Sequence, residues 1–439
     1  MTQAGAKPLP WHLQGNWAPV QDEIDVTDLT VEGEIPAALE GSYYRNGMNP
    51  RSGYSTTWFF GHGMVNRIQL GGGRALSFRN RYVRTPYFEK DMHIAEAVMD
   101  PTASPANTNI VRHGGRFFAL EEFHSAWEMS ADLETIGCFD YDGKVKGPMT
   151  PHVKFCPRTG EMLFFGYDVM GPPYLRYHRA DASGALVQSE EIDLPRPVMI
   201  HDLNITRNHV VFMDLPIVFS LEAGFQFKPE CGARLGVMPR TGGNADVQWH
   251  DIEPCTVFHP MNSYETDDGK IILDVCRQPS LMSGGLGDLD QQANLWRWTI
   301  DTVAGGVKEE QRDDLFCDFP RVDDRLVGER ARFGYAAEYE EADCPTFAHS
   351  LLRYDLESGA VVKHDLGATV RGGEPVFVPA SPDAAEDEGW ILALVHDEGT
   401  DVSYLQIIDG RNFEGPPVAR VRIPQRVPYG SHGNWIPNT

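Results

Sequence analysis

Short runs of apolar, β-branched and aromatic residues alternate with turn-forming residues through most of the chain. The apolar runs 153–155 and 162–165, for example, flank the turn sequence Arg-Thr-Gly-Glu at 158–161. Glycine in such turns supplies the positive φ that tight hairpins need. A similar hairpin is expected over 138–145, around Asp142-Gly143. The pattern therefore predicts antiparallel β-hairpins along the whole chain.

The rhythm of the turns sets the size of the repeating unit. A four-stranded blade of roughly 50–60 residues is at the upper end for propeller repeats, so the 439 residues hold about seven blades with insertions. No proline-rich or glycine/serine-rich linker divides the chain. We therefore expect an all-β fold in which residues 1–439 form a single β-propeller domain, with residues 1–16 as an irregular N-terminal arm.

Composition and charge narrow the class of protein. The formal net charge of −25, without any basic run, argues against nucleic acid as a partner and against electrostatic attachment to anionic lipid. The chain has no apolar signal segment and no stretch of 18 apolar residues, so a soluble cytoplasmic protein is expected. Its seven cysteines lack C-x-x-C spacing and predict neither a disulfide framework nor a zinc ribbon.

Four histidines carry the chemistry that the pattern suggests. His152, His201, His259 and His432 each abut an apolar run, and the gaps of 49, 58 and 173 residues fit one histidine per blade with two blades skipped. Inner strands of a propeller can bring such side chains together on the axis, where neutral imidazoles bind a metal. Four imidazoles favour Fe(II) over Zn²⁺, and ligand type alone leaves Ni and Cu open. Four unrelated histidines are the alternative on spacing alone.

Several segments also resemble one known family, the carotenoid cleavage oxygenases. Besides the surroundings of the four histidines, they are Gly41–Pro50, Phe60–Met64, Ala106–Asn109 and Gly373–Pro379. The resemblance runs in order from about residue 15 to the C-terminus. It implies a seven-bladed β-propeller with a dome of loops and short helices over the metal face, and Fe(II) held by the four histidines. The family reaction is the cleavage of a C=C double bond by O₂ into two carbonyl products.

The resemblance also implies carboxylates that accept the outer N–H of three imidazoles. It places Glu122 behind His201, Asp318 behind His259 and Glu374 behind His432. Such an acceptor fixes the tautomer and orientation of the ring. Asp318 replaces the family's usual glutamate and has a shorter reach, so it is the least secure of the three. Glu121 is a second candidate beside Glu122, and His152 is left without a carboxylate.

Other positions are expected to face dioxygen or substrate. Thr108 matches a position that puts a methyl group beside an open coordination site, although an ordinary strand residue is an equal alternative. The candidate tunnel walls are Phe59, Phe258, Phe123 and Trp127, and packing within the core is the alternative for the last two. A small hydrophobic alkene and O₂ are the expected partners.

The choice of alkene depends on two further positions. Stilbene-cleaving relatives hold the phenol of their substrate with a tyrosine and a lysine, where this chain has Thr102 and Glu121. Because a carboxylate repels an ionised phenol, a carotenoid or apocarotenoid is favoured. A stilbene or phenylpropenoid aryl alkene, of the lignostilbene, resveratrol or isoeugenol type, is the alternative. An isomerase or a propeller that only binds a partner is more remote.

Two features remain beside the site. The apolar segments Ile217–Leu221 and Phe225–Phe227 are candidates for a patch that makes peripheral membrane contact through hydrophobic side chains. A buried strand followed by a loop is the alternative. His62 stands where the family commonly has aspartate in a Gly-Asp-Gly-Met turn.

Overall fold

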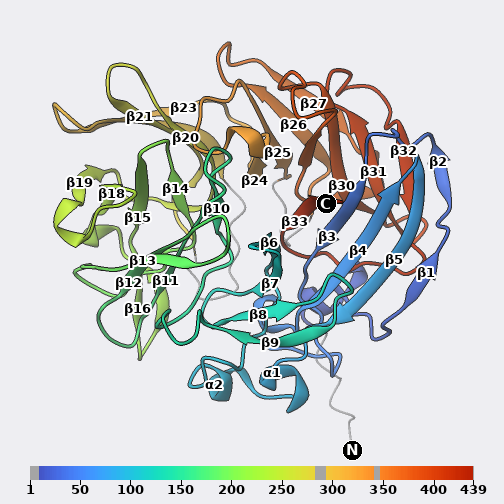
Figure 1. Ribbon diagram of the computed structural model, residues 1–439, viewed down its shortest axis with the longest axis horizontal. Helices are drawn as coiled ribbons and strands as arrows, with labels where there is room; N and C mark the ends of the chain where they lie inside the picture. The colour runs from blue at the N-terminus through green and yellow to red at the C-terminus, as the bar shows by residue number, and fades with distance from the viewer. Residues whose placement is uncertain (1–8, 282–292, 341–346, 439) are drawn as a thin grey trace, which may run out of the picture.

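The computed structural model describes residues 9–281, 293–340 and 347–438. Their strands form seven antiparallel sheets arranged around a central axis (Figure 1). The expected all-β, seven-bladed propeller is therefore confirmed. No helix in these ranges is long and apolar enough to cross a membrane.

Three of the blades come mainly from the first half of the chain, and each is given in the order in which its strands pair. The first is β1 (Asp25–Thr27), β5 (Arg74–Tyr82), β4 (Met64–Gly71), β3 (Gly41–Arg45) and β33 (Gly433–Pro437); the second is β6 (Asn109–His113), β7 (Arg116–Leu120), β8 (Ala126–Met129) and β9 (Thr135–Phe139); the third is β10 (Lys154–Phe155), β11 (Met162–Tyr167), β12 (Leu175–Ala180) and β13 (Leu186–Ile192).

The other four blades follow around the ring. The fourth is β14 (Leu203–Ile205), β15 (His209–Asp214), β18 (Ala233–Pro239) and β19 (Gln248–Ile252), and the fifth is β20 (Thr256–Glu265), β21 (Lys270–Gln278), β22 (Asn294–Asp301) and β23 (Val307–Gln311). The sixth is β24 (Cys317–Arg321), β25 (Phe333–Glu338), β26 (Ser350–Asp355) and β27 (Val361–Asp365). The seventh is β2 (Val31–Gly33), β32 (Ala419–Arg422), β31 (Val402–Asp409), β30 (Gly389–Asp397) and β28 (Val370–Gly372), and β29 (Val376–Pro379) also pairs with β30. The hairpin of β16 (Ile217–Ser220) and β17 (Gly224–Phe227) stands apart from them.

The two ends of the chain close the ring. Strand β33, near the C-terminus, pairs with β3, so that Tyr43 lies opposite Trp435. Strand β2, near the N-terminus, pairs with β32, with Glu32 opposite Arg420. Each end therefore completes a blade that the other end began. This interlocking ties the first and last blades together.

Apolar side chains fill the spaces between neighbouring blades. Between the blades of β15 and β21, for example, Leu235, Leu273 and Trp298 are fully buried in one cluster. Burying apolar surface in this way contributes about 25 cal/mol per Å². Seven such contacts around the ring hold the inner strands in fixed positions, as a site assembled from several blades requires.

The hairpin expected over 138–145 is wrong. Strand β9 ends at Phe139, and the turn that follows has positive φ at Tyr141 (57°), Asp142 (58°) and Gly143 (74°). Three successive left-handed residues turn the chain away from a return strand. The Tyr141 ring instead stacks on Phe164 of the next blade, with ring centroids 5.6 Å apart. The segment is therefore a connection between blades.

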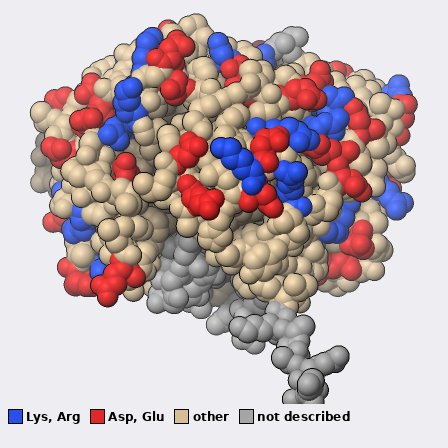
Figure 2. Space-filling view, turned by 90° about the horizontal axis from the view of Figure 1, so that it is seen from below, with Lys and Arg blue, Asp and Glu red and all other residues tan. Residues whose placement is uncertain are grey.

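Loops and short helices complete the fold. The α-helices are α1 (Pro86–Glu89) and α2 (Ile94–Ala97), which lie at the lower edge of the ring in Figure 1. The 3₁₀ helices are η1 (Trp11–Leu13), η2 (Gly15–Trp17), η3 (Trp58–Phe60), η4 (Pro229–Cys231), η5 (Asn244–Asp246) and η6 (Asp324–Leu326). Acidic and basic side chains are interspersed on the face shown in Figure 2.

Candidate metal centre

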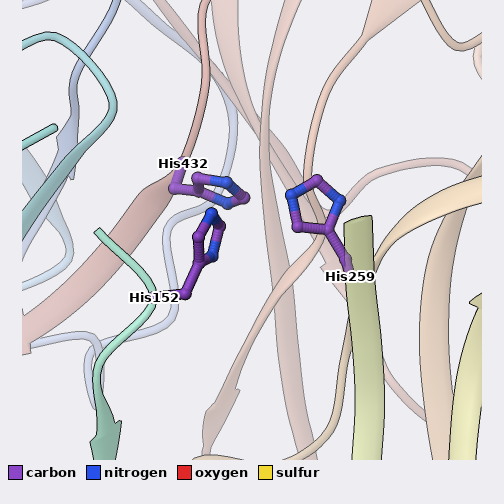
Figure 3. Close-up of side chains that lie close together, drawn as sticks. All are labelled: His152, His259 and His432. Atoms are coloured by element: carbon purple, nitrogen blue, oxygen red, sulfur yellow. The ribbon is translucent and has the colours of Figure 1, made fainter. Parts of the chain in front are cut away.

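The structure brings the four histidines together near the axis. His432 directly precedes the inner strand β33, and His152 and His201 each lie two residues before the first residue of β10 and β14. His259 lies within β20. The ring centroid of His152 is 4.3 Å from that of His201, 5.1 Å from His259 and 4.8 Å from His432. Figure 3 shows His152, His259 and His432 turned toward one point, and their ligand nitrogens lie within 4.8 Å of one another. His201 stands slightly outside this group.

The sequence around His259 explains how a residue inside a strand reaches the axis. Pro260 has no backbone N–H, so it cannot donate to the neighbouring strand. The ladder between β20 and β21 shifts register between Val257 and Pro260 and again between Pro260 and Asn262. Such a bulge re-aims the side chains beside it. The irregularity therefore directs the imidazole of His259 to the other three.

The surroundings of His152 and His259 favour neutral imidazoles with free lone pairs. Burial, together with the neighbouring histidines, lowers the pKa of His152 well below its usual value. Burial also lowers the pKa of His259. Burial opposes protonation of His201 as well, but Glu122 outweighs it and the pKa of His201 is raised. The Nε2 atoms of His152 and His259 have no hydrogen-bond partner among the described residues. Buried nitrogens left open in this way fit a metal ion.

Carboxylates lie behind three of the rings. The Nδ1 atom of His201 is 3.2 Å from both oxygens of Glu122, that of His259 is 2.8 Å from Oδ1 of Asp318, and that of His432 is 3.1 Å from Oε1 of Glu374. With Nδ1–H donating to the carboxylate, each Nε2 keeps its lone pair for a metal. This is the pairing that the sequence predicted.

Asp318 makes the shortest of these contacts despite its short side chain. The ladder between β24 and β25 shifts register between Asp318 and Arg321, and Phe319 has a positive φ of 51°. A left-handed conformation at a non-glycine residue costs about 1–3 kcal/mol. The distorted backbone thus carries the Asp318 carboxylate toward His259, and a sequence comparison of side-chain lengths misses this.

The carboxylates are themselves held. Tyr167 donates its hydroxyl to Oε1 of Glu122 at 2.6 Å, and the backbone N–H of Gly433 donates to Glu374 at 2.7 Å. Burial acts to raise the pKa of Glu374, but Arg321 at 3.3 Å and His432 lower it to about 2. Glu374 is therefore ionised at neutral pH and supplies negative charge behind the ring of His432.

The four histidines His152, His201, His259 and His432 are together called the histidine ring. An apolar cavity adjoins one side of it. Its lining includes Trp17, Met48, Trp58, Phe59, Thr108, Phe258, Leu281, Ala293, Phe319, Tyr339 and Phe347, together with His201, His259 and His432. The Phe258 ring centroid lies 4.5 Å from that of His201. Thr108 donates its hydroxyl to Oδ1 of Asn107 at 3.0 Å, which leaves its methyl group as the apolar part of the side chain. Phe319, Tyr339 and Phe347 were missed because their sequence context carries no distinguishing signal.

Four predicted pocket residues lie outside this lining. The indole N–H of Trp127, on β8, donates to the backbone carbonyl of Thr102 at 3.0 Å. Phe123 packs against Phe225, with centroids 6.0 Å apart. Glu121 is buried and lies 2.6 Å from Nδ1 of His124.

Glu121 does not favour a carotenoid over a phenolic substrate. Burial disfavours the charged form of His124, yet Glu121 raises its pKa overall. The carboxylate of Glu121 thus has a cationic or hydrogen-bonding partner within the chain, and it does not line the apolar cavity. It is therefore not a bare charge that would repel an ionised phenol.

His62 belongs to a turn and not to the histidine ring. Its Nδ1 accepts the backbone N–H of Arg51 at 3.0 Å, and its ring lies 4.7 Å from that of Tyr87 between centroids. Burial lowers the pKa of His62 to about 4, so the side chain is neutral near pH 7. It replaces an acidic turn residue with a neutral acceptor.

A second, polar cavity of about 360 Å³ adjoins the other side of the ring. It is lined by residues of the inner strands β6, β10, β14, β20, β24 and β33, including Asn109, Arg112, Lys154, Asn204, Asn262, Arg321 and Asn434, together with Asp202 and Glu374. His152, His259 and His432 border it. His152 therefore borders only the polar cavity, His201 only the apolar one, and His259 and His432 both.

Known proteins share this whole arrangement of blades. A family model described as retinal pigment epithelial membrane protein matches residues 17–437. A carotenoid cleavage oxygenase of Mycobacterium tuberculosis is 33% identical over 98% of this chain and 98% of its own. The crystal structure of a Pseudomonas brassicacearum lignostilbene dioxygenase has a TM-score of 0.90, with 28% identity over 99% of this chain and 100% of the other. A cobalt-substituted Synechocystis apocarotenoid oxygenase has a TM-score of 0.85, with 26% identity over 96% and 97%.

These matches agree with the geometry of the site. The family match spans nearly the entire propeller, and the segments that carry the histidines and their carboxylates lie inside it. Since both the sequence and the fold match over almost their full lengths, the chain belongs to the carotenoid cleavage oxygenase family and is an oxygenase that cleaves an alkene oxidatively.

Proposed function

We propose that this oxygenase binds Fe(II) through His152, His201, His259 and His432 and uses O₂ to cleave a carotenoid or apocarotenoid into two carbonyl products. The observation that carries the proposal is the cluster of buried imidazoles with a carboxylate behind three of them. Nitrogen ligands of this type suit iron, and the three carboxylates offset the charge of a buried divalent ion.

The chain's own residues would perform the tasks around the metal. When bound, Fe(II) supplies the site at which dioxygen is activated beside the alkene. Glu122, Asp318 and Glu374 orient their imidazoles and keep each Nδ1 protonated. The methyl group of Thr108 keeps the neighbouring space apolar and small. No acid–base pair is required, because the metal and dioxygen carry the bond-breaking chemistry.

The apolar cavity supports an extended hydrophobic substrate. Its aromatic walls, Trp58, Phe59, Phe258, Phe319 and Phe347, exclude water and offer flat faces to a conjugated chain. Among them, the ring centroid of Phe258 lies 4.5 Å from that of His201 and the centroid of Phe319 lies 5.0 Å from that of His259. A double bond beside these two rings is therefore adjacent to the metal ligands.

An aryl alkene is the second candidate substrate. The structural similarity to a lignostilbene dioxygenase, with a TM-score of 0.90, favours it. Aromatic walls suit an aryl ring as well as a polyene, and the paired Glu121 gives no reason to reject a phenol. The two candidates therefore differ mainly in length.

Product analysis separates the candidates. The Fe(II)-loaded protein is incubated with an apocarotenal, resveratrol and isoeugenol under ¹⁸O₂, and the products are identified by mass spectrometry. Cleavage of the apocarotenal into two carbonyl fragments at the highest kcat/KM is the expected result. Preferential cleavage of resveratrol or isoeugenol would show that the substrate is an aryl alkene. If the protein with stoichiometric iron consumed no O₂ with any alkene, the proposal would be overturned.

We also propose that a hydrophobic patch delivers the substrate from a membrane surface. Leu221, at the turn of the β16–β17 hairpin, is 82% exposed, and Val218, Phe219 and Phe227 are half-buried beside it. Ile217 and Phe225 are buried and anchor the hairpin. With a net charge of −25, contact with lipid would rest on apolar side chains.

A cytoplasmic location is consistent with the cysteines. The six cysteines in the described ranges are all free thiols, as is usual in a reducing compartment. We propose that the enzyme acts there, with the alkene and O₂ as its partners.

A further inference from the structure

The four imidazoles differ in what lies behind them. His201, His259 and His432 each have a carboxylate oxygen 2.8–3.2 Å from Nδ1. Within the part of the chain that the structure describes, His152 has no such hydrogen bond, but Oδ2 of Asp202 lies 3.6 Å from its Nδ1. Asp202 directly follows His201 in the chain. One segment thus supplies one imidazole and faces the outer nitrogen of another.

Asp202 is held firmly in this position. It is 2% exposed and borders the polar cavity. Lys154, on β10, donates its ammonium group to the carboxylate at 2.8 Å, and the backbone N–H of Leu203 donates at 2.6 Å. Lys154 lies two residues after His152. The ion pair therefore cross-links the two segments that carry His152 and His201.

We infer that Asp202, fixed by Lys154, is a fourth outer carboxylate that positions the imidazole of His152. A separation of 3.6 Å exceeds a hydrogen bond, so Asp202 acts as a buried charge that faces the ring N–H. This charge favours the proton on Nδ1 and leaves Nε2, which has no partner among the described residues, for the metal. Lys154 balances the charge of Asp202. Asp202 acts through His152 and is a positioning residue.

Each of the four imidazoles in the histidine ring then has a carboxylate facing its outer nitrogen. Asp202 and Lys154 border the polar cavity, and neither lines the apolar one. Changes at this pair should therefore alter the metal site while leaving the walls of the apolar cavity untouched. This inference rests on the proposed function, because it assumes that the four imidazoles hold the metal.

The test compares Asp202→Asn and Lys154→Met with a matched control, Asp274→Asn. Asp274 is also 2% exposed, and it accepts two hydrogen bonds of 2.8 Å from Arg297 in the blade of β20–β23, outside the lining of both cavities. The affinity of each full-length protein for Co²⁺ is measured by competition with a chelator. The visible absorption of the bound cobalt and the Tm of the metal-free protein are recorded alongside.

Asp202→Asn is expected to weaken cobalt binding about 5- to 20-fold and to shift the cobalt absorption, since losing a directly bonded outer partner costs about 10- to 100-fold. Lys154→Met should act in the same direction but less. Asp274→Asn should lower Tm comparably and leave affinity and spectrum unchanged. If Asp202→Asn kept the wild-type cobalt affinity and absorption, or if Asp274→Asn weakened cobalt binding equally, the inference would be overturned and the proposed function would stand. A wild-type protein that binds no cobalt would overturn the proposed function with it.

Discussion

The two sides of the histidine ring differ in chemistry. The cavity that borders His201 is lined mainly by aromatic and aliphatic side chains, whereas amide, ammonium, guanidinium and carboxylate groups share the lining of the cavity that borders His152 with apolar side chains. His259 and His432 border both. A metal at the ring would thus meet a mainly apolar space on one side and paired charges on the other. The carboxylates behind the ligands are divided between the two sides, with Glu122 and Asp318 at the apolar cavity and Asp202 and Glu374 at the polar one.

The polar side can hold buried carboxylates because each of them is paired with a cation. Arg321 lies 3.3 Å from Glu374, and Lys154 lies 2.8 Å from Asp202. A buried charge that loses its partner costs about 3–5 kcal/mol. Each pair therefore gives a buried carboxylate behind the ring a cationic partner.

Removing a ligand that both cavities share should have the largest effect. His259→Ala should reduce activity more than about 100-fold and abolish stoichiometric iron binding, since loss of an outer partner alone costs about 10- to 100-fold. Iron content and O₂ uptake are the measurements. His178→Ala is the control, because His178 on β12 is fully buried but lies outside the ring. Retention of full iron content by His259→Ala would contradict the account.

The carboxylates behind the ring test how the ligands are supported. Asp318→Asn should weaken metal binding about 10- to 100-fold because it removes the acceptor of the His259 N–H. Asp318→Glu should also weaken it, by about 3- to 10-fold, because the distorted backbone at Phe319 already brings the shorter side chain to 2.8 Å. Chelator competition measures both. Tighter binding by Asp318→Glu would show that the backbone does not compensate for length.

The apolar side can be changed without touching the ligands. Phe258→Ala removes an aromatic wall 4.5 Å from the His201 ring, between centroids, and should raise KM about 10-fold through lost apolar contact. Iron content should stay at the wild-type level. Steady-state kinetics and metal analysis on the same sample check both points. A variant with normal KM but depleted iron would place Phe258 among the supports of the ring.

The smallest expected effect lies at the surface. Leu221→Asp should weaken binding to neutral phosphatidylcholine vesicles about 3- to 10-fold, because it removes the most exposed apolar side chain of the β16–β17 hairpin. Sedimentation of vesicles with the protein measures this. Val303→Asp is a matched control, since Val303 is 88% exposed in another blade. Equal losses in the two variants would remove the hairpin as the contact site.

Parts of the fold and the site could be predicted from the sequence. The turn rhythm led to the propeller, and the spacing of four histidines led to their meeting at the axis. Local motifs led to Glu122 and Glu374. The backbone distortion at Phe319 and the burial of Glu121 against His124 depend on tertiary structure, which side-chain type does not reveal.

The role of Asp202 could not be predicted from the sequence. Its position next to His201 is plain in the sequence, but its contacts are not. Its approach to His152, and the ion pair with Lys154, follow from the packing of β10 beside β14. Residues that support a metal ligand from a neighbouring blade can be found only when the blades are placed in space.

An anaerobic crystal structure of the Fe(II)-loaded protein with an apocarotenal tests the central claim most directly. The account predicts one iron bound by Nε2 of His152, His201, His259 and His432, with the polyene in the cavity lined by Phe59 and Phe258. Iron bound elsewhere, or a polyene in the polar cavity beside Asn262 and Arg321, would contradict it.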